Sequence, residues 1–257
     1  MSNPHQATDQ YLVEHIHRPA AEYLIEVACP RLGERVLDLA CGTGIVARLV
    51  APKIGSEGSI RAVDVSREVL VLAQKLYHAT VLFETHAARA EALPFHDDHF
   101  DLVVCAHGLQ HFAHPDQACR EMARVLRPGG RAAVMVWGAI QDAPSFLALC
   151  QALREDQLTP IGDKVAILQS FSIPTAEELR RLMEAGGFTD LQVSTHAIDT
   201  SYASARDFLT GGGEGDSALP DALAARVEAE LSPWVAKDGT LSAPMSVHVA
   251  VGVVQGS

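Results

Sequence analysis

The sequence predicts an α/β fold built on a doubly wound, mostly parallel sheet, and two features support this. Two apolar runs bounded by turn residues, at 36–40 and 101–106, lack the polar alternation of a half-exposed strand. Such runs are typical of strands that are buried on both faces of a parallel sheet. Segments with helical periodicity separate the apolar runs, and this alternation of strand and helix implies right-handed crossovers between parallel strands.

The first half of the chain alternates regularly. Strands are predicted at residues 36–40, 59–64, 81–85, 101–106 and 131–137, and helices at 43–51, 67–77 and 116–126. In the second helix, apolar side chains such as Leu70 and Ala73 recur at helical spacing. The third helix is predicted to end before Pro128, which cannot extend it, and Gly129 and Gly130 permit a turn into the next strand.

The second half adds two strands and makes seven. Helices are predicted at 144–157, 175–187 and 221–231, and strands at 190–197 and 246–254. Thr175, with Glu178 three residues later, forms the capping-box pattern of a helix start. We expect a single domain, 1–257, in which segments 138–174 and 203–244 are cap or lid insertions and the glycines at 211–216 act as a hinge.

Charge and cysteine content restrict the function. The chain has 20 Lys and Arg against 32 Asp and Glu, a net charge of −12, which disfavours nucleic acid and membrane headgroups as partners. Small neutral or cationic substrates remain possible. The 5 cysteines are odd in number and lack CxxC spacing, which favours buried thiols in a reducing compartment. With no leader or membrane-spanning run, the sequence predicts a cytoplasmic protein.

The loop after the first strand predicts a nucleoside-type cofactor. Gly42 and Gly44 follow a buried strand and open a helix, so backbone N–H groups can approach a ligand closely. Asp64 ends the next strand about 20 residues later, where a carboxylate can accept hydrogen bonds from ribose hydroxyls. Asp38 suits the ammonium and sulfonium groups of S-adenosylmethionine and would repel a pyrophosphate. This charge favours S-adenosylmethionine over a nicotinamide cofactor.

Four passages now resemble a known family. They are GERVLDLACGTG (33–44), AVDVS (62–66), AEALPF with FDLVVC (90–95 and 100–105) and REMARVLRPGGR (120–131). In this order they resemble the class I S-adenosylmethionine-dependent methyltransferases. Within that class they resemble the branch that contains the ubiquinone/menaquinone biosynthesis methyltransferases and related enzymes that act on small molecules. The resemblance is strong over 11–137. It implies a Rossmann-like seven-stranded sheet with an antiparallel last strand, a small helical cap, and an N-terminal helical cover over 1–32.

The resemblance also assigns site residues. It places Asp38, Gly42 and Gly44 at the methionine end of the cofactor, Asp64 at the ribose and Val65 on the adenine, and it includes Ala40 among the cofactor-binding residues. It places Ala90 and Glu91 along the adenine edge, and Ala106 and His107 at the methyl-transfer pocket. It places Tyr11 over the cofactor.

One position departs from the family. An aspartate commonly precedes Ala90 and accepts a hydrogen bond from the adenine amino group, but this chain has Arg89. Arginine has no acceptor and cannot make that contact. Either the carboxylate of Glu91 or a backbone carbonyl replaces it, or adenine binds less tightly.

Candidates for the acceptor side follow the fourth strand. His107, at the carboxyl end of that strand, is expected to line the pocket, and His107 and His111 are the candidate catalytic bases. No metal is expected, because no carboxylate or cysteine cluster accompanies His107, His111 and His114. Aromatic residues that either line an apolar acceptor pocket or belong to the core are Trp137, Phe171, Tyr202 and Phe208.

The sequence therefore predicts in-line transfer of a methyl group from S-adenosyl-L-methionine to O, N or C of a small-molecule metabolite, leaving S-adenosyl-L-homocysteine. The alternatives are an enzyme that uses the same fold for a cyclisation or rearrangement, a nicotinamide-dependent oxidoreductase, and a non-catalytic scaffold. We expect a monomer or homodimer that binds a small-molecule acceptor and engages neither nucleic acid nor membrane.

Overall fold

A computed structural model describes residues 13–155, 167–210 and 221–255. By its internal contacts the chain divides into two compact units. The first comprises Met1–Pro19, Trp137–Pro174 and Ala197–Ser246, and the second Ala20–Val136, Thr175–His196 and Val247–Ser257. Tyr11 and the predicted hinge glycines at 211–216 lie outside the described residues.

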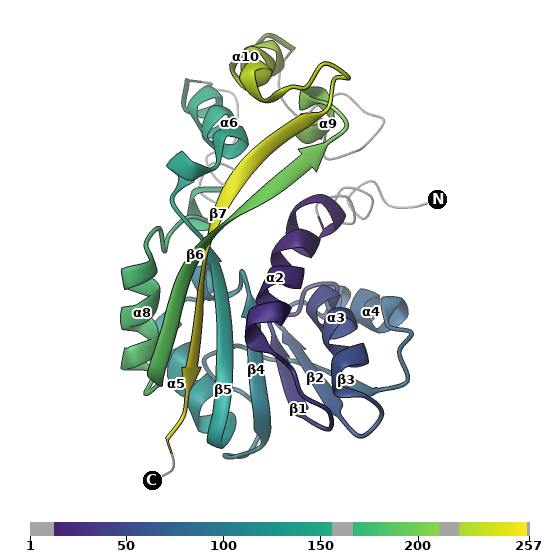
Figure 1. Cartoon of the computed structure of the whole chain (residues 1–257), viewed down its shortest axis with the longest axis vertical. Coiled ribbons are helices and arrows are strands. Elements are labelled where there is room, and N and C mark those ends of the chain that lie inside the picture. The colour runs from purple at the N-terminus through teal and green to yellow at the C-terminus, as the bar shows by residue number, and fades with distance from the viewer. Residues whose placement is uncertain (1–12, 156–166, 211–220, 256–257) are drawn as a thin grey trace. The chain divides into compact units, whose positions relative to one another are not determined.

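The predicted seven-stranded, mostly parallel sheet is confirmed (Figure 1). Its strands follow the order β3-β2-β1-β4-β5-β7-β6. The first five pair in parallel. The bounds are β1 (Arg35–Leu39), β2 (Ser59–Asp64), β3 (Leu82–Ala87), β4 (Phe100–Ala106), β5 (Leu126–Trp137), β6 (Thr189–Tyr202) and β7 (Leu241–Val253). The order of the strands reverses between β1 and β4, and such a switch point is where open α/β sheets bind ligands.

The last strands are antiparallel, as the resemblance implied. Hydrogen bonds join Gly129 to Val254 and Gly138 to Ser246, so residue numbers on β7 fall as those along β5 rise. The β6 and β7 strands are longer than predicted, and Pro244 lies inside β7. In this register Pro244 is opposite position 140, beyond the end of β5, so its missing N–H costs no ladder hydrogen bond on that side.

Helices cover both faces of the sheet in the second unit (Figure 1). Their bounds are α2 (Arg18–Ala28), α3 (Ile45–Ile54), α4 (Arg67–Leu76), α5 (Pro115–Val125) and α8 (Ala176–Ala185). α5 packs beside α8. The predicted N-cap of α8 is confirmed, because the Thr175 hydroxyl accepts the Glu178 N–H at 3.2 Å. The second bond differs from that of a capping box, since the Glu178 carboxylate accepts the Thr175 hydroxyl at 3.0 Å. α4 begins in the same way, with Ser66 accepting the Val69 N–H at 3.3 Å.

The junction of α5 and β5 differs from the predicted helix, turn and strand. β5 starts at Leu126, directly after α5, and includes Pro128 and both glycines. Leu126 pairs with Phe100, but the next pair along β4 joins Leu102 to Arg131. The intervening residues therefore bulge out of the ladder, with Gly129 at φ +76°. A bulge accommodates both the proline and the left-handed glycine without ending the strand.

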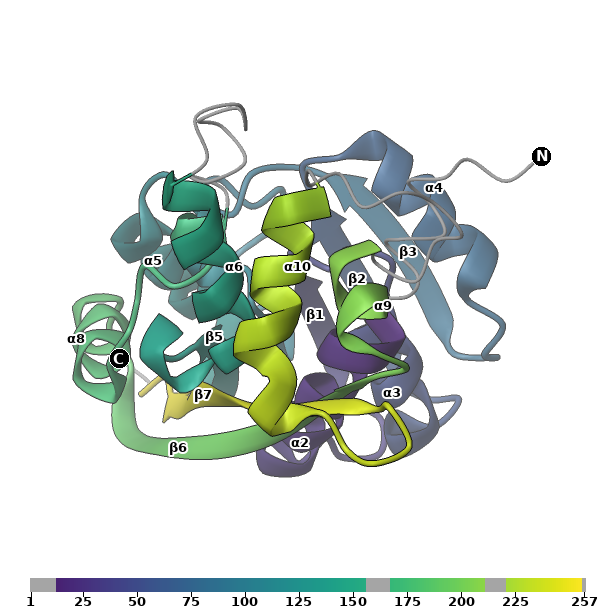
Figure 2. The ribbon, with the colours of Figure 1, turned by 90° about the horizontal axis from the view of Figure 1, so that it is seen from above.

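The first unit contains helices and a cluster of aromatic rings. Its helices are α6 (Pro144–Glu155), α9 (Ala205–Thr210) and α10 (Asp221–Leu231), with α10 packed on α6 and α9 (Figure 2). The predicted cap segments 138–174 and 203–244 fall almost wholly within this unit, and their action as a cover stays a prediction. In the described part of the chain, no helix is long and apolar enough to cross a membrane.

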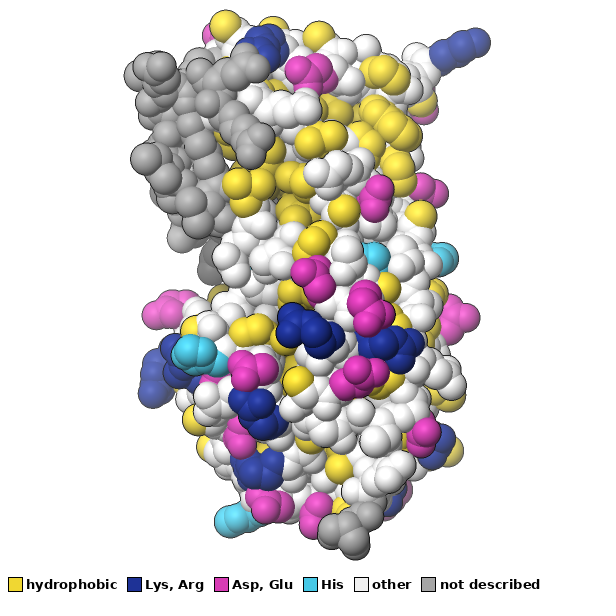
Figure 3. Space-filling view, turned by 90° about the vertical axis from the view of Figure 1, so that its left-hand side faces the viewer, with side chains coloured by type: hydrophobic (Ala, Val, Ile, Leu, Met, Phe, Trp, Pro, Cys, Tyr) yellow, Lys and Arg dark blue, Asp and Glu magenta, His cyan; other side chains and the backbone are white. Residues whose placement is uncertain are grey.

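Charged side chains on the second unit are mixed in sign. On the face that carries α8, basic side chains lie next to acidic ones (Figure 3). Arg180 and Glu184 of α8, 3.9 Å apart, are one such pair. Neighbouring charges of opposite sign partly neutralise one another, and this face therefore does not present the basic stripe that a nucleic-acid backbone requires.

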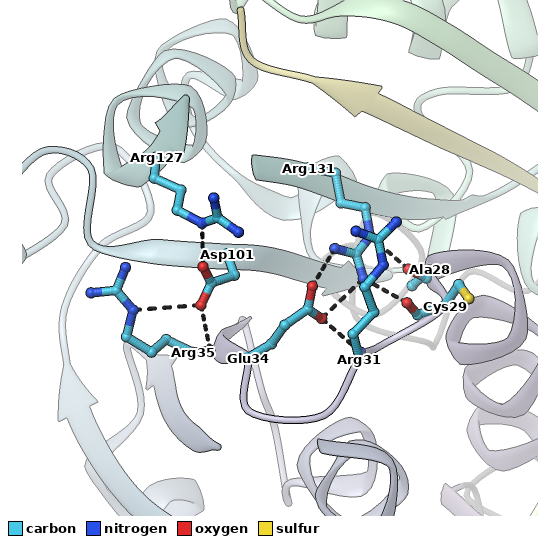
Figure 4. Close-up of polar contacts among 8 residues, drawn as sticks. All are labelled: Ala28, Cys29, Arg31, Glu34, Arg35, Asp101, Arg127 and Arg131. Atoms are coloured by element: carbon cyan, nitrogen blue, oxygen red, sulfur yellow. Dashed lines mark hydrogen bonds and ion pairs between the residues drawn. The ribbon is translucent and has the colours of Figure 1, made fainter. Parts of the chain in front are cut away.

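Ion pairs fasten the amino ends of β1, β4 and β5 (Figure 4). Glu34, which precedes β1, binds the Arg131 guanidinium through both carboxylate oxygens, at 2.7 and 3.0 Å. Arg131 also donates to the carbonyls of Ala28 and Cys29. In a second group, Asp101 accepts the backbone N–H of Arg35 and pairs with Arg127. These contacts bind the end of α2 and three strands to one another.

Candidate active site

The carboxyl ends of β1, β2 and β4 bring most of the predicted site residues together in the second unit. Asp38 lies near the end of β1, Asp64 ends β2 and Ala106 ends β4. β1 pairs with both β2 and β4, and these ends therefore meet at one edge, at the switch point of the sheet. The site is thus built from segments that are far apart in the sequence.

The loop after β1 adopts a left-handed backbone at three positions. Ala40 has φ +56°, Gly42 +52° and Gly44 +78°. Left-handed glycines cost little, but for alanine this conformation is strained, and strain of this kind concentrates at functional sites. A Cβ on Gly42 would meet no atom of the described residues within 4 Å, whereas one on Gly44 would touch Ala73 at 3.4 Å. Gly42 therefore faces open space that a ligand can occupy, and Gly44 allows close packing.

Asp38 is a buried carboxylate without an ionic partner among the described residues. Its side chain is 1% exposed and accepts one hydrogen bond, from the Ala47 N–H in the first turn of α3, at 3.0 Å. Burial raises the pKa of Asp38 to about 7, and the negative charge of Asp64 adds to this effect. The positive charge of Arg48 lowers the pKa of Asp38, but by less than burial raises it. A cationic ligand group beside Asp38 would favour the charged carboxylate.

Asp64 organises the loop that it faces. One carboxylate oxygen accepts the Gly42 N–H and the other the Ser66 N–H, both at 3.0 Å. Each oxygen retains acceptor capacity, since a carboxylate oxygen has two lone pairs. The half-buried Asp64 therefore ties β2 to the glycine loop while still able to accept from hydroxyl groups.

Residues predicted to meet the adenine differ in exposure. Val65 is 69% exposed directly after β2, an apolar surface at the place expected for the adenine. Ala90 is 4% exposed. The Glu91 carboxylate is also buried and already accepts the N–H groups of Ala113 and His114. Arg89 lies 3.3 Å from the same oxygen.

His107 and His111 have different surroundings. His107 is 7% exposed and has φ +57°. Like Ala40 after β1, it is a non-glycine residue in the strained left-handed conformation at the end of a strand. His111 is exposed and ends the short helix η2 (Leu109–His111). Although His111 as a whole is exposed, partial desolvation of its ring lowers the pKa of His111 below its ordinary value. His114 is an exposed N-cap of α5. Among the described residues no cluster able to hold a metal occurs.

Sequence reasoning missed Gly108 and Arg48. A Cβ on Gly108 would lie 2.6 Å from the Cβ of Ala40, and only glycine therefore lets the segment after β4 approach the loop after β1. Arg48 donates to the Thr43 carbonyl at 2.6 Å and braces the same loop. The glycine after the fourth strand was a readable signal, whereas nothing in the local pattern distinguishes Arg48 from a surface arginine.

Three of the four predicted acceptor aromatics, Phe171, Tyr202 and Phe208, belong to one cluster of rings in the first unit. Phe208 lies against Tyr202 and Phe146, with ring centroids 5.1 and 5.5 Å apart, and Phe146 also contacts Phe171. Tyr202 is 1% exposed. At least Tyr202 is therefore a core residue of this unit. Trp137, also buried, lies 6.1 Å from the His17 ring.

Comparison with known proteins gives a consistent result. A family model described as a methyltransferase domain matches residues 37–134. The chain is 33% identical over 190 residues to the ubiquinone/menaquinone biosynthesis C-methyltransferase UbiE of Nitrosospira multiformis. The aligned region covers 69% of this chain and 76% of that protein.

Solved structures share the fold. The YcgJ protein from Bacillus subtilis matches with a TM-score of 0.62 at 22% identity, over 93% of this chain and 99% of that chain. The [4+2]-cyclase SpnF matches with a TM-score of 0.58 at 19% identity, over 93% and 81% of the two chains. Identities this low support the fold and not a shared reaction.

Proposed function

The chain belongs to the family of S-adenosylmethionine-dependent methyltransferases that these relatives represent, and we propose that it methylates a carbon atom of a small-molecule metabolite. The observation that supports the methyl donor is Asp38, a buried carboxylate with no ion pair among the described residues, beside an open glycine loop at the switch point. The carbon acceptor is supported by the similarity to C-methyltransferases. This family assignment sets aside the nicotinamide-dependent oxidoreductase and the non-catalytic scaffold.

The residues present fit S-adenosylmethionine. Asp38 supplies the negative charge that its ammonium and sulfonium groups need. The methionine end of the cofactor would occupy the space beside Gly42, next to Ala40 and Gly44 of the same loop. Asp64 can accept from the ribose hydroxyls with its remaining lone pairs. The exposed side chain of Val65 offers an apolar face to the adenine.

Adenine's amino group needs an acceptor other than Arg89. The carboxylate oxygen Oε1 of Glu91 already receives two backbone N–H groups and the Arg89 guanidinium. We propose that a backbone carbonyl of the segment 88–91 makes this contact. The second carboxylate oxygen of Glu91, Oε2, is the competing acceptor, and substitution of Glu91 decides between the two. A carbonyl oxygen has two lone pairs and can serve without any change of side chain.

The chemistry asks little of acid–base groups on the donor side. Bound S-adenosylmethionine supplies an activated methyl group, whose sulfur leaves as a neutral thioether. The protein then has to hold the acceptor in line and exclude water. On the acceptor side, Ala106 and His107 would line the pocket. His111 or His107 would accept the proton of an acceptor hydroxyl, which makes the adjacent ring carbon nucleophilic. After that carbon has taken the methyl group it loses its own hydrogen as a proton, and the histidine returns its proton to the oxygen.

The names of the relatives support a class of acceptor. UbiE of N. multiformis is named a C-methyltransferase of ubiquinone and menaquinone biosynthesis. We propose a reduced quinone or related phenol for this chain also, because its electron-rich ring carbon suits the mechanism above. The net charge of −12 disfavours an anionic acceptor and is compatible with one that binds in its uncharged form.

A second candidate keeps the cofactor but transfers no methyl group. SpnF, which shares the fold, is a [4+2]-cyclase. In such an enzyme the cation would act electrostatically and stay intact.

One experiment separates these functions. Purified protein is incubated with isotopically labelled S-adenosylmethionine and a panel of reduced naphthoquinones, benzoquinones, phenols and amines. We expect labelled product one CH₂ heavier, one S-adenosylhomocysteine per product, and the label on a ring carbon by NMR. Label on oxygen or nitrogen would contradict the carbon assignment, and an isomeric product without S-adenosylhomocysteine would favour the cyclase. Absence of S-adenosylmethionine binding by calorimetry would overturn both.

A further inference from the structure

The Glu91 side chain joins two segments of the candidate active site. Glu91 follows β3, in the segment predicted to lie along the adenine, and its carboxylate is 9% exposed. Its oxygen Oε1 accepts the N–H of Ala113 at 3.0 Å and that of His114 at 3.2 Å. Both donors belong to the segment 107–114, which runs from the end of β4 to the start of α5. A single carboxylate oxygen thus bridges residues more than twenty positions apart.

The electrostatics of Glu91 suit a bridge of this kind. Burial alone would raise the pKa of Glu91, but N–H donors from its own backbone, His114 and Ala113, together with Arg89, hold the pKa below its ordinary value. The carboxylate is therefore charged, and it lies at the amino end of α5, where a helix favours a negative group. Charge-assisted hydrogen bonds are about twice as strong as neutral ones.

Side chains of α5 also bind the backbone of the segment that follows β3 and contains Glu91. Gln117 donates to the Glu91 carbonyl at 3.0 Å, and the Glu121 carboxylate accepts the Leu93 N–H at 2.8 Å. One turn further on, Arg124 donates to the carbonyls of Leu93 and Phe95. Three polar residues on one face of α5 therefore fix the backbone from Glu91 to Phe95. Of these contacts, only the carboxylate of Glu91 reaches back to the segment that carries the two histidines.

We infer that Glu91 is a positioning residue, which fixes the segment 107–114 against the adenine-edge segment and so places His107 and His111. The inference rests on the proposed function, because it assigns the two histidines to the acceptor side. It also gives Glu91 a role other than that of an adenine acceptor. The affinity for the cofactor should then depend little on this carboxylate, whereas the order of the segment 107–114 should depend on it strongly.

The test compares Glu91→Ala, Glu91→Gln and Arg89→Ala. Amide hydrogen exchange is measured without ligand, and calorimetry gives the affinity for S-adenosylhomocysteine. We expect Glu91→Ala to raise exchange at Ala113 and His114 about tenfold, because both N–H groups lose a charged acceptor. Glu91→Gln retains an acceptor oxygen and should rescue part of this protection. The matched control Arg89→Ala leaves the carboxylate in place and should change exchange by less than about twofold.

Affinity measurements decide between a positioning residue and an adenine contact. We expect Glu91→Ala and Glu91→Gln to bind S-adenosylhomocysteine within about threefold of the wild type, less than the loss of one hydrogen bond to a charged group. Unchanged exchange in Glu91→Ala would overturn the inference. So would a loss of affinity that disappears with an analogue lacking the adenine amino group. If Glu91→Ala does not fold, Glu91→Gln answers both questions. Failure of the wild type to bind the cofactor would refute the proposed function alone, because exchange is measured without ligand.

Discussion

Strand β1 has acidic side chains at both ends, in opposite electrostatic surroundings. At the amino end, Glu34 is bound through both oxygens to Arg131, and nearby Asp101 pairs with Arg35 and Arg127. At the carboxyl end, Asp38 is more deeply buried than either of them, yet it accepts one backbone N–H and makes no ion pair among the described residues. The positive charge of Arg48 offsets only part of the cost of burying it. Acidic side chains are thus paired at one end of the strand and only partly compensated at the other.

This difference separates a structural role from a functional one. A paired buried acid holds chain segments together, whereas an uncompensated one lowers the stability of the ligand-free fold. Burial and neighbours move the pKa values accordingly. Although burial opposes it, the Arg35 N–H and Arg127 hold the pKa of Asp101 below its ordinary value, while burial raises that of Asp38 to about 7. An acid with such a raised pKa at a sheet's switch point marks the position of a cationic ligand group.

The largest expected effect is at the amino end. Glu34→Ala leaves the Arg131 guanidinium, only 13% exposed, without its carboxylate. Removing one partner of a buried pair costs about 3 kcal/mol or more, and we expect this loss in the free energy of unfolding by urea titration. Affinity for S-adenosylhomocysteine should not change, because the pair lies at the opposite end of the strand.

Arg127→Ala is the matched control at the same end. Its side chain is 49% exposed, so the loss should be at most about 1 kcal/mol. A Glu34→Ala protein as stable as the control would contradict the structural role assigned to the pair. A changed cofactor affinity would contradict the separation of the two ends.

Asp38→Asn should have the opposite effects to Glu34→Ala: the free energy of unfolding should rise and the cofactor affinity should fall. The folded protein keeps the Asp38 proton up to about pH 7, whereas an unfolded aspartate loses it near 3.8. Ionisation of the native carboxylate therefore costs about 4 kcal/mol above pH 7. Asparagine avoids this cost but buries an amide N–H₂, so we expect a gain of about 2 kcal/mol in unfolding free energy at pH 8. Affinity for S-adenosylmethionine should fall about a hundredfold, since the cation loses its charged partner.

The pH series supplies the control for this variant. The stability difference between Asp38→Asn and the wild type should grow from pH 4 to pH 7 and then level off. A destabilised variant with unchanged affinity would show that Asp38 is a structural acid like Glu34, and the contrast between the two ends would fail.

The smallest expected effect is the pH dependence of cofactor binding in the wild type. Asp38 must lose its proton before it attracts a cation, and its pKa is about 7. Affinity for S-adenosylmethionine should therefore rise about tenfold between pH 6 and pH 8, as followed by calorimetry. Asp38→Asn should remove the rise, while Glu34→Gln should retain it. A rise that persists in Asp38→Asn would assign the titration to another group.

Local patterns predicted the sheet because each strand and helix is encoded by its own periodicity. Strand β2 and helix α10 have the predicted bounds. Errors occurred where a local signal was overruled by pairing. The strand predicted at 246–254 begins earlier, because β7 has only one neighbour at Pro244 and can therefore include it. Likewise, Ile198, Thr200 and Tyr202 extend the buried face of β6 beyond the predicted end.

The sequence alone determined the family and the order of the donor site, because the glycines, Asp38 and Asp64 follow directly from successive strands. Tertiary structure decided which acids remain available. Glu34 meets Arg131 across 97 positions, and Glu91 meets Ala113 across 22. Periodicity describes neighbours within one element and carries no record of such pairs. Whether a carboxylate neutralises an arginine, holds a segment or awaits a cation is therefore fixed only when the chain folds.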